Sequence, residues 1–324
     1  MALSPDQMRE QIKGVTIVLA TPMNRDGSLD LAGLQANTEY LIEKGKGKKL
    51  MLVPTGSTGE SYALSDEERL KVIETVIQTA GGRVPVVAGT AKASTGQTIA
   101  LSRAAEKAGA DGVQIALPYY HVPSEDGLCR HFLEIADGLN IGVMIYNNPL
   151  VSKLWMPPHL MARCAAHPNI VADKENTPDV TQYKAMRDAV DPGKMTILCG
   201  AGDLLFAFEA VLGCPGFVTW TANFAPALSF ALLEAAEACD FRRVREVVEK
   251  TGRFYDLLGA CCRNRGRDPW VLTGYSAGHI YVGMLKAALE IIGLAGGPVR
   301  GPGDDLTTEE RGQLKTPLGN LGLA

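Results

Sequence analysis

The chain has 324 residues, of which 46% are hydrophobic and 21% charged, a composition typical of a globular protein with a large buried core. Its 32 Lys and Arg residues against 36 Asp and Glu residues exclude the basic footprint of a nucleic-acid-binding protein. The sequence contains neither an apolar run of about 18 residues nor a charged-then-apolar N-terminal segment, so we expect no membrane partner and a cytoplasmic location.

Eight short apolar runs bounded by glycine or proline recur along the first two-thirds of the chain. Such runs are typical of strands buried on both faces of a parallel sheet. The predicted strands are 15–19, 49–54, 85–89, 112–116, 142–146, 170–173, 196–199 and 216–219. Segments with helical periodicity lie between them, at 30–43, 66–79, 95–107, 124–137, 157–166, 179–189 and 203–212.

This alternation of strand and helix predicts a (β/α)8 TIM barrel. A doubly wound open sheet is the alternative, but it usually has fewer strands, and no G-x-G-x-x-G motif follows the first strand. From about residue 225 only helices are expected, at 226–239, 241–262, 280–292 and 307–314, with a long loop at 263–278. We therefore predict a barrel over 1–224, which contains the active site, and a C-terminal helical extension over 225–324.

Polar residues follow several of the predicted strands, at the barrel end where enzymes of this fold place their active sites. The segments in question are Gly56-Ser57-Thr58-Gly59-Glu60, Pro118-Tyr119-Tyr120, Tyr146-Asn147-Asn148-Pro149, Asp173-Lys174-Glu175 and Gly200-Ala201-Gly202. We expect their hydroxyl, phenol and amine groups to share one rim.

Lys174 is the most informative of these residues, because it follows the apolar run 170–172. An ammonium at a strand end is partly desolvated, which lowers its pKa and leaves free amine to attack a ketone. The alternative is a surface lysine paired with Asp173 or Glu175.

The turn 56–59 and Tyr146 each allow two interpretations. Backbone N–H groups of a glycine-rich turn can hold a carboxylate, but the same turn is also an ordinary strand-to-helix connection capped by Ser57 or Thr58. Tyr146 could carry protons between an amine and a substrate hydroxyl, or could be a core residue with a satisfied hydroxyl.

Four motifs in this order, Gly56-Ser57-Thr58-Gly59-Glu60, Pro118-Tyr119-Tyr120, Tyr146-Asn-x-Pro and Lys174-Glu175, resemble those of one enzyme family. It is the family of dihydrodipicolinate synthase and N-acetylneuraminate lyase, the pyruvate lyases and aldolases that form a Schiff base. The resemblance covers roughly residues 14–294. It implies a lyase acting on pyruvate or a pyruvate-derived 2-oxo acid, a homodimer or homotetramer, and no metal or organic cofactor.

The resemblance also implies roles for individual residues. Lys174 would form the imine, Tyr146 would transfer protons, and Ser57 would relay them to Tyr146. Tyr120 would complete the relay from a neighbouring subunit. The implied substrate-binding residues are Ser57, Thr58, Gly200 and Val218.

Several positions depart from the family pattern and bear on the substrate. The family's dihydrodipicolinate synthases carry an arginine where this chain has Val151, and a nonpolar side chain cannot pair with a carboxylate, although Lys153 could reach in. Asp173 stands where the family prefers an apolar residue, and 281–286 replaces an Asn-Pro-x-Pro segment behind the long loop 263–278. These departures favour a catabolic relative that cleaves or dehydrates a different 2-oxo acid over the dihydrodipicolinate synthase of lysine biosynthesis, which stays an alternative.

Two other classes of protein could also be built on this barrel, a metal-dependent aldolase and a non-catalytic binding protein. A metal-dependent aldolase needs clustered ligands, whereas the five histidines are scattered and only His121 and His131 lie near one strand end. The seven cysteines contain no C-x-x-C pair, which predicts buried thiols rather than disulfides or a zinc site.

A barrel that binds a small ligand without turnover is the third class, and the presence of both Lys174 and Tyr146 argues against it.

Overall fold

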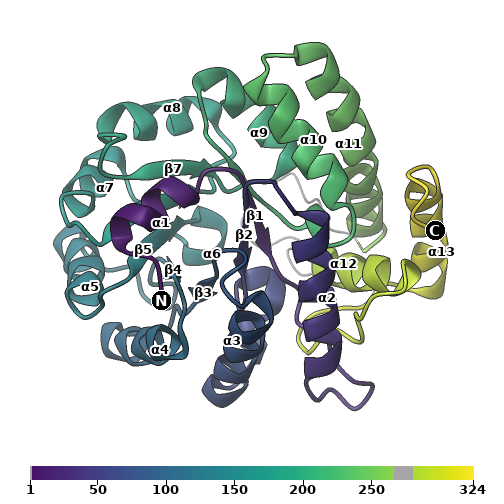
Figure 1. Ribbon diagram of the computed structural model, residues 1–324, viewed down its shortest axis with the longest axis horizontal. Coiled ribbons are helices and arrows are strands. Elements are labelled where there is room, and N and C mark those ends of the chain that lie inside the picture. Colours follow the sequence, from purple (N-terminus) through teal and green to yellow (C-terminus); the bar gives the residue numbers. More distant parts are fainter. Residues whose placement is uncertain (1, 266–279) are drawn as a thin grey trace.

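The structure is a computed structural model that describes residues 2–265 and 280–324. Its centre is a parallel eight-stranded sheet in the order β2-β1-β8-β7-β6-β5-β4-β3, which a bridge between Leu52 and Val86 closes into a barrel (Figure 1). The strands are β1 Val15–Val18, β2 Leu50–Val53, β3 Val87–Gly89, β4 Gly112–Ala116, β5 Gly142–Asn147, β6 Ile170–Glu175, β7 Thr196–Cys199 and β8 Phe217–Thr219. The predicted TIM barrel is confirmed.

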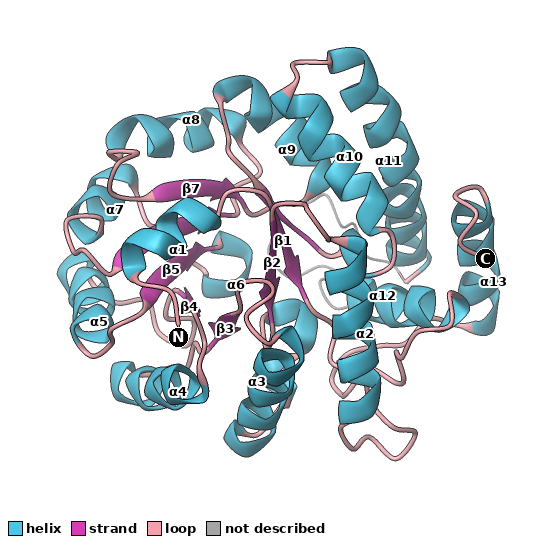
Figure 2. Ribbon diagram, in the orientation of Figure 1, coloured by secondary structure: helices cyan, strands magenta, loops and turns pink. Residues whose placement is uncertain are grey.

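Helices surround the barrel on its outside (Figure 2). Side-chain caps start several of them, as at α3, where Ser65 and Glu68 form a reciprocal capping box. The surrounding helices are α2 Leu31–Lys44, α3 Asp66–Ala80, α4 Thr95–Ala108, α5 Glu125–Asp137, α7 Pro158–Cys164, α8 Val180–Ala189, α9 Asp203–Glu209 and α10 Pro226–Glu237. Short elements at the strand ends are η1 Ser57–Gly59, η2 Ser61–Ala63, α6 Pro149–Ser152, η3 Ala210–Leu212 and η4 Thr221–Asn223.

The strands contribute to two apolar layers, because alternate side chains point to opposite faces. On β8, Phe217 packs in the large cluster between sheet and helices, whereas Val218 packs inside the barrel with Leu198. Helix α1 (Pro5–Gln11), which the sequence did not predict, places Met8 in the inner cluster. A side chain at Gly142 would come within 2.3 Å of the Met8 sulfur, so glycine is required for this packing.

The C-terminal helices are α11 Phe241–Asn264, α12 Ile280–Ile291 and α13 Thr308–Gly319. The last continues past its predicted end at 314, because Leu318 packs in the same cluster as Leu314. That cluster also joins Trp220 and Phe224, at the end of the barrel, to Met284 of α12. The division at 224/225 stays a prediction, and the predicted loop 263–278 falls largely outside the described residues.

No helix within 2–265 or 280–324 combines the length and the apolar character that a bilayer crossing needs.

Candidate active site

Lys174 lies in β6, in register with Tyr146 of β5 and Leu198 of β7. The strand is two residues longer than predicted, so Lys174 lies within the sheet and only 5% of its surface is exposed. Burial lowers the pKa of Lys174 to about 7, with a small opposing effect from Cys199. Since Asp173 and Glu175 point to the other face of the strand, the interpretation of Lys174 as a paired surface lysine is wrong.

Tyr146 lies directly beside the amine, with the Lys174 Nζ 3.7 Å from the centroid of its ring. The phenol oxygen accepts a hydrogen bond from Asn148 Nδ2 at 2.6 Å and is also hydrogen-bonded to Ser57. Burial raises the pKa of Tyr146, and these two hydrogen bonds oppose that rise. The phenol is therefore protonated at neutral pH, and because Asn148 can only donate through this nitrogen, the phenol keeps its own proton for another acceptor.

The turn after β2 brings Ser57 and Thr58 to the same end of the barrel. The two residues open η1, and Thr58 is buried. The Thr58 hydroxyl lies 3.4 Å from the phenol oxygen of Tyr281, which belongs to the first turn of α12. The turn therefore meets Tyr146 through Ser57 and the C-terminal region through Thr58.

Gly200 directly follows β7, and Val218 lies in β8, the next strand of the barrel. The amide of Gly200 donates to the carbonyl of Glu175 at 2.6 Å, and a side chain there would lie 2.9 Å from Lys174 Cγ. Glycine at position 200 therefore leaves room for the lysine stem. Val218 is buried inside the barrel together with Ala172, two residues before the lysine.

Tyr120 is not brought to this group of residues within the single chain. It lies in the loop after β4 with 72% of its surface exposed, and its ring contacts that of His121. The structure thus gathers Lys174, Tyr146, Ser57 and Thr58 and leaves Tyr120 on the surface. A role for Tyr120 at the neighbouring subunit's site stays a prediction.

The stretch after β5 carries no buried cation. Val151 is 40% exposed in the short helix α6, and Lys153, which ends that helix in a left-handed conformation, has an exposed side chain. Neither side chain provides a buried positive charge beside Tyr146.

The two histidines near the end of β4, His121 and His131, lie in different environments. His131 is buried on α5, where its Nδ1 hydrogen-bonds to the Thr95 hydroxyl at 2.9 Å, and burial lowers the pKa of His131 to about 4. His121 is exposed in the loop after β4. In the described ranges, no group of three or more His, Cys, Asp or Glu side chains is arranged to hold a metal ion.

The comparison with known proteins agrees with this geometry. The sequence model of the dihydrodipicolinate synthetase family matches residues 11–262. The chain belongs to this family. A 4-hydroxy-tetrahydrodipicolinate synthase of Methanoculleus marisnigri is 35% identical over 96% of this chain and 99% of the relative. One of Gluconacetobacter diazotrophicus is 32% identical over 96% and 97%.

Solved structures of the dihydrodipicolinate synthetase family have the same fold. The dihydrodipicolinate synthase of Aquifex aeolicus superposes with a TM-score of 0.83 at 28% identity, covering 96% of this chain and 98% of the other. A family member from a prophage of E. coli K12, solved in complex with pyruvate, gives 0.84 at 29% identity, covering 96% and 99%. These findings confirm the predicted family, the fold and the predicted lyase class of enzyme.

Three buried carboxyl groups behind Lys174 were not predicted as part of the site. Glu175 accepts hydrogen bonds from Asn147 Nδ2 at 2.8 Å and from Trp155 Nε1 at 3.1 Å. Burial raises the pKa of Glu175 to about 7 and that of Glu209 to about 8, and burial together with Glu175 raises the pKa of Asp173. The departure at Asp173 was the only sequence signal of this cluster.

Tyr281 was also missed as an individual residue. The sequence indicated only that 281–286 departs from the family pattern. The contact of Tyr281 with Thr58 could not be predicted, because the two residues are 223 positions apart in the chain.

Proposed function

We propose that this chain is a lyase or aldolase whose Lys174 forms a Schiff base with the C2 carbonyl of pyruvate or a pyruvate-derived 2-oxo acid. The observation that carries the proposal is the buried Lys174 amine, with a pKa lowered to about 7, beside the protonated Tyr146 phenol. About half of such amines are uncharged at neutral pH and able to attack a carbonyl. The family member solved with pyruvate supports the same substrate class.

In this proposal the imine formed by Lys174 is itself the electron sink for the reaction. The Lys174 amine adds to C2 of the 2-oxo acid, and the resulting carbinolamine loses its hydroxyl as water after Tyr146 supplies a proton. When a carbon–carbon bond breaks, the protonated imine accepts the electron pair of the C3–C4 bond and becomes an enamine. When such a bond forms, the enamine donates this electron pair from C3 to the new carbon. Ser57 relays protons to Tyr146, while Ser57 and Thr58 hold the carboxylate and Gly200 and Val218 line the pocket.

A second candidate is the 4-hydroxy-tetrahydrodipicolinate synthase reaction, which the names of the similar proteins favour. Exposed Val151 and Lys153 supply no buried cation for the carboxylate of a second substrate. We therefore favour a different acceptor or a cleavage reaction. A turnover assay with aspartate semialdehyde alongside a panel of uncharged aldehydes, each with pyruvate, distinguishes the two.

We also propose a cytoplasmic homo-oligomer in which Tyr120 of one subunit reaches the site of the next. The exposed position of the Tyr120 side chain supports this arrangement.

The deciding experiment is to trap the imine with borohydride in the presence of pyruvate and to locate the adduct by mass spectrometry. We expect a reduced adduct on the peptide that contains Lys174, with a rate of formation that rises through pH 7 as the amine loses its proton. Lys174→Ala should abolish the adduct, whereas the exposed control Lys153→Ala should retain it. Absence of an adduct in the unmodified protein would overturn the Schiff-base proposal and favour a non-catalytic barrel.

A further inference from the structure

The C-terminal part of the chain returns to the mouth of the barrel at Tyr281. This residue lies in the first turn of α12, 223 positions after Thr58 in the sequence, yet the two hydroxyl oxygens are 3.4 Å apart. The ring of Tyr281 packs edge-on against Trp220, which follows β8, with centroids 6.0 Å apart. The phenol therefore approaches the proposed carboxylate-binding turn from a segment that the barrel itself does not supply.

A buried ion pair holds α12 to the same turn. Glu60, two residues after Thr58, is fully buried and pairs with Lys286, which lies five residues after Tyr281 on α12. Lys286 Nζ also donates to the carbonyl of Pro298 at 2.8 Å. Since separating two buried opposite charges is strongly unfavourable, the position of α12 relative to the turn is well determined.

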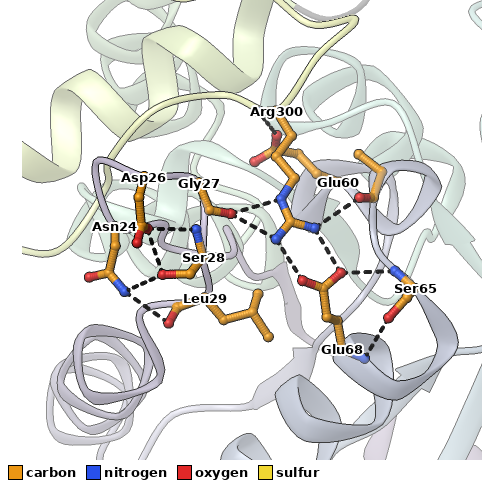
Figure 3. Close-up of polar contacts among 10 residues, drawn as sticks. Asn24, Asp26, Gly27, Ser28, Leu29, Glu60, Ser65, Glu68 and Arg300 are labelled. Carbon is orange, nitrogen blue, oxygen red and sulfur yellow. Dashed lines mark hydrogen bonds and ion pairs between the residues drawn. The ribbon is translucent and has the colours of Figure 1, made fainter.

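Arg300 extends this connection to the neighbouring loops (Figure 3). Its amide donates to Glu60 Oε2 at 2.7 Å, and its guanidinium makes two bonds to the Glu68 carboxylate, at 2.6 and 2.7 Å. The same guanidinium donates to the carbonyl of Gly27 at 2.8 Å. These contacts therefore hold the C-terminal segment against the turn after β2, and they fix the position of Tyr281 relative to Thr58.

Among the described residues that connect α12 and the C-terminal segment to this turn, the cations Lys286 and Arg300 are paired with Glu60 and Glu68, respectively. The groups that this connection leaves to bind an anion at Thr58 are therefore hydroxyls. Burial raises the pKa of the Tyr281 phenol, so it keeps its proton at neutral pH. A protonated phenol and a threonine hydroxyl at 3.4 Å share one long hydrogen bond, and a carboxylate oxygen can accept from both.

We propose that Tyr281 is a substrate-binding residue whose phenol, together with the Thr58 hydroxyl, donates to the carboxylate of the 2-oxo acid. The proposal rests on the proposed function, because it assigns the recognition of the same substrate that Lys174 attacks. In this proposal the carboxylate is bound by residues from two parts of the chain, Thr58 of the turn after β2 and Tyr281 of α12.

The test measures how the borohydride-trapped adduct on Lys174 depends on pyruvate concentration. Tyr281→Phe keeps the ring against Trp220 and removes only the hydroxyl. We expect the pyruvate concentration at half-maximal trapping to rise about tenfold, as for the loss of one hydrogen bond to a charged group, while the maximal adduct yield and Tm are unchanged. Trapping with hydroxyacetone, a ketone without a carboxylate, should be the same in Tyr281→Phe and the unmodified protein.

A matched control is Tyr255→Phe, which removes a phenol hydroxyl from a second ring packed on Trp220, with centroids 5.7 Å apart. We expect its pyruvate dependence to equal that of the unmodified protein. Equal pyruvate dependence for Tyr281→Phe would overturn the role of Tyr281 and leave the Schiff-base proposal intact. A tenfold loss that also appears with hydroxyacetone would likewise overturn carboxylate recognition. Failure of the Schiff-base proposal itself is distinguishable, since the unmodified protein would then give no adduct.

Discussion

The two faces of strand β6 place opposite chemistry within a few residues of each other. Lys174 faces the barrel interior beside Tyr146, whereas Asp173 and Glu175 face the layer between sheet and helices. Burial lowers the pKa of the amine and raises the pKa values of both acids, so each group moves toward its neutral form. If all three shared one face, the acids would stabilise the ammonium, and the amine would lose its nucleophilic form. Strand alternation therefore keeps the amine reactive.

The outer face also supports the inner one. Glu175 binds Asn147 and Trp155, which bracket the segment after β5, and within that segment Asn148 donates to the Tyr146 phenol. The acids thus act on the proposed chemistry through the loop that positions Tyr146. Changes on the inner face should therefore have their main effect on turnover, and changes on the outer face should have their main effect on stability.

The largest effect is expected on the inner face, from Tyr146→Phe. The ring beside Lys174 is kept and the proton donor is lost, so kcat should fall by roughly 10²- to 10³-fold, as for the loss of a general acid–base group, with a small decrease in Tm because Asn148 Nδ2 loses its acceptor. Steady-state kinetics with the substrate found in the aldehyde panel, together with thermal melting, measure both quantities. Tyr40→Phe, on the outer helix α2, is the matched control. Normal turnover by Tyr146→Phe would remove the proton-transfer role.

On the outer face, Glu175→Ala should lower the free energy of unfolding by about 3 kcal/mol. The change leaves Asn147 Nδ2, Trp155 Nε1 and the Thr177 amide without their common acceptor in a dry environment. Urea denaturation measures the loss. Glu134→Ala, at an exposed site on α5, should change the same quantity by less than about 0.5 kcal/mol. Equal stability of the two variants would contradict a supporting role for the outer face.

A pH dependence of stability is expected from Glu209, the third buried acid on the outer side of the sheet. Burial raises its pKa from 4.5 to about 8, so between these values the folded state holds a proton that the unfolded state has released. Its contribution to stability is complete below pH 4.5 and is lost as pH rises through 8, at up to about 1.4 kcal/mol per pH unit.

Glu209→Gln should therefore flatten the decline of unfolding free energy between pH 5 and 8, measured by urea denaturation at each pH. An unchanged slope would show that Glu209 ionises normally in the folded protein.

The sequence predicted the barrel well because its signals are local. Short apolar runs bounded by glycine or proline identified all eight strands, and the position of Lys174 after such a run located the amine at the proposed site. Helix α1 was missed although Ser4 and Gln7 form a reciprocal capping box at its start, and only its packing on Gly142 is a tertiary contact between residues far apart in the chain. The extension of β6 to Glu175 was missed because pairing with β5 and β7, not residue type, lengthens the strand.

By itself the sequence determined the fold class, the family and the strand ends at which Lys174, Tyr146, Ser57 and Thr58 lie, since strand periodicity and turn residues are encoded within a few positions. Tertiary structure alone decided three further points: the acids lie behind the amine, Tyr120 is on the surface, and Tyr281 reaches Thr58. Each of these depends on which side chains burial brings together across the chain, and burial also decides their protonation. No local pattern contains that information, because desolvation is a property of the packed molecule.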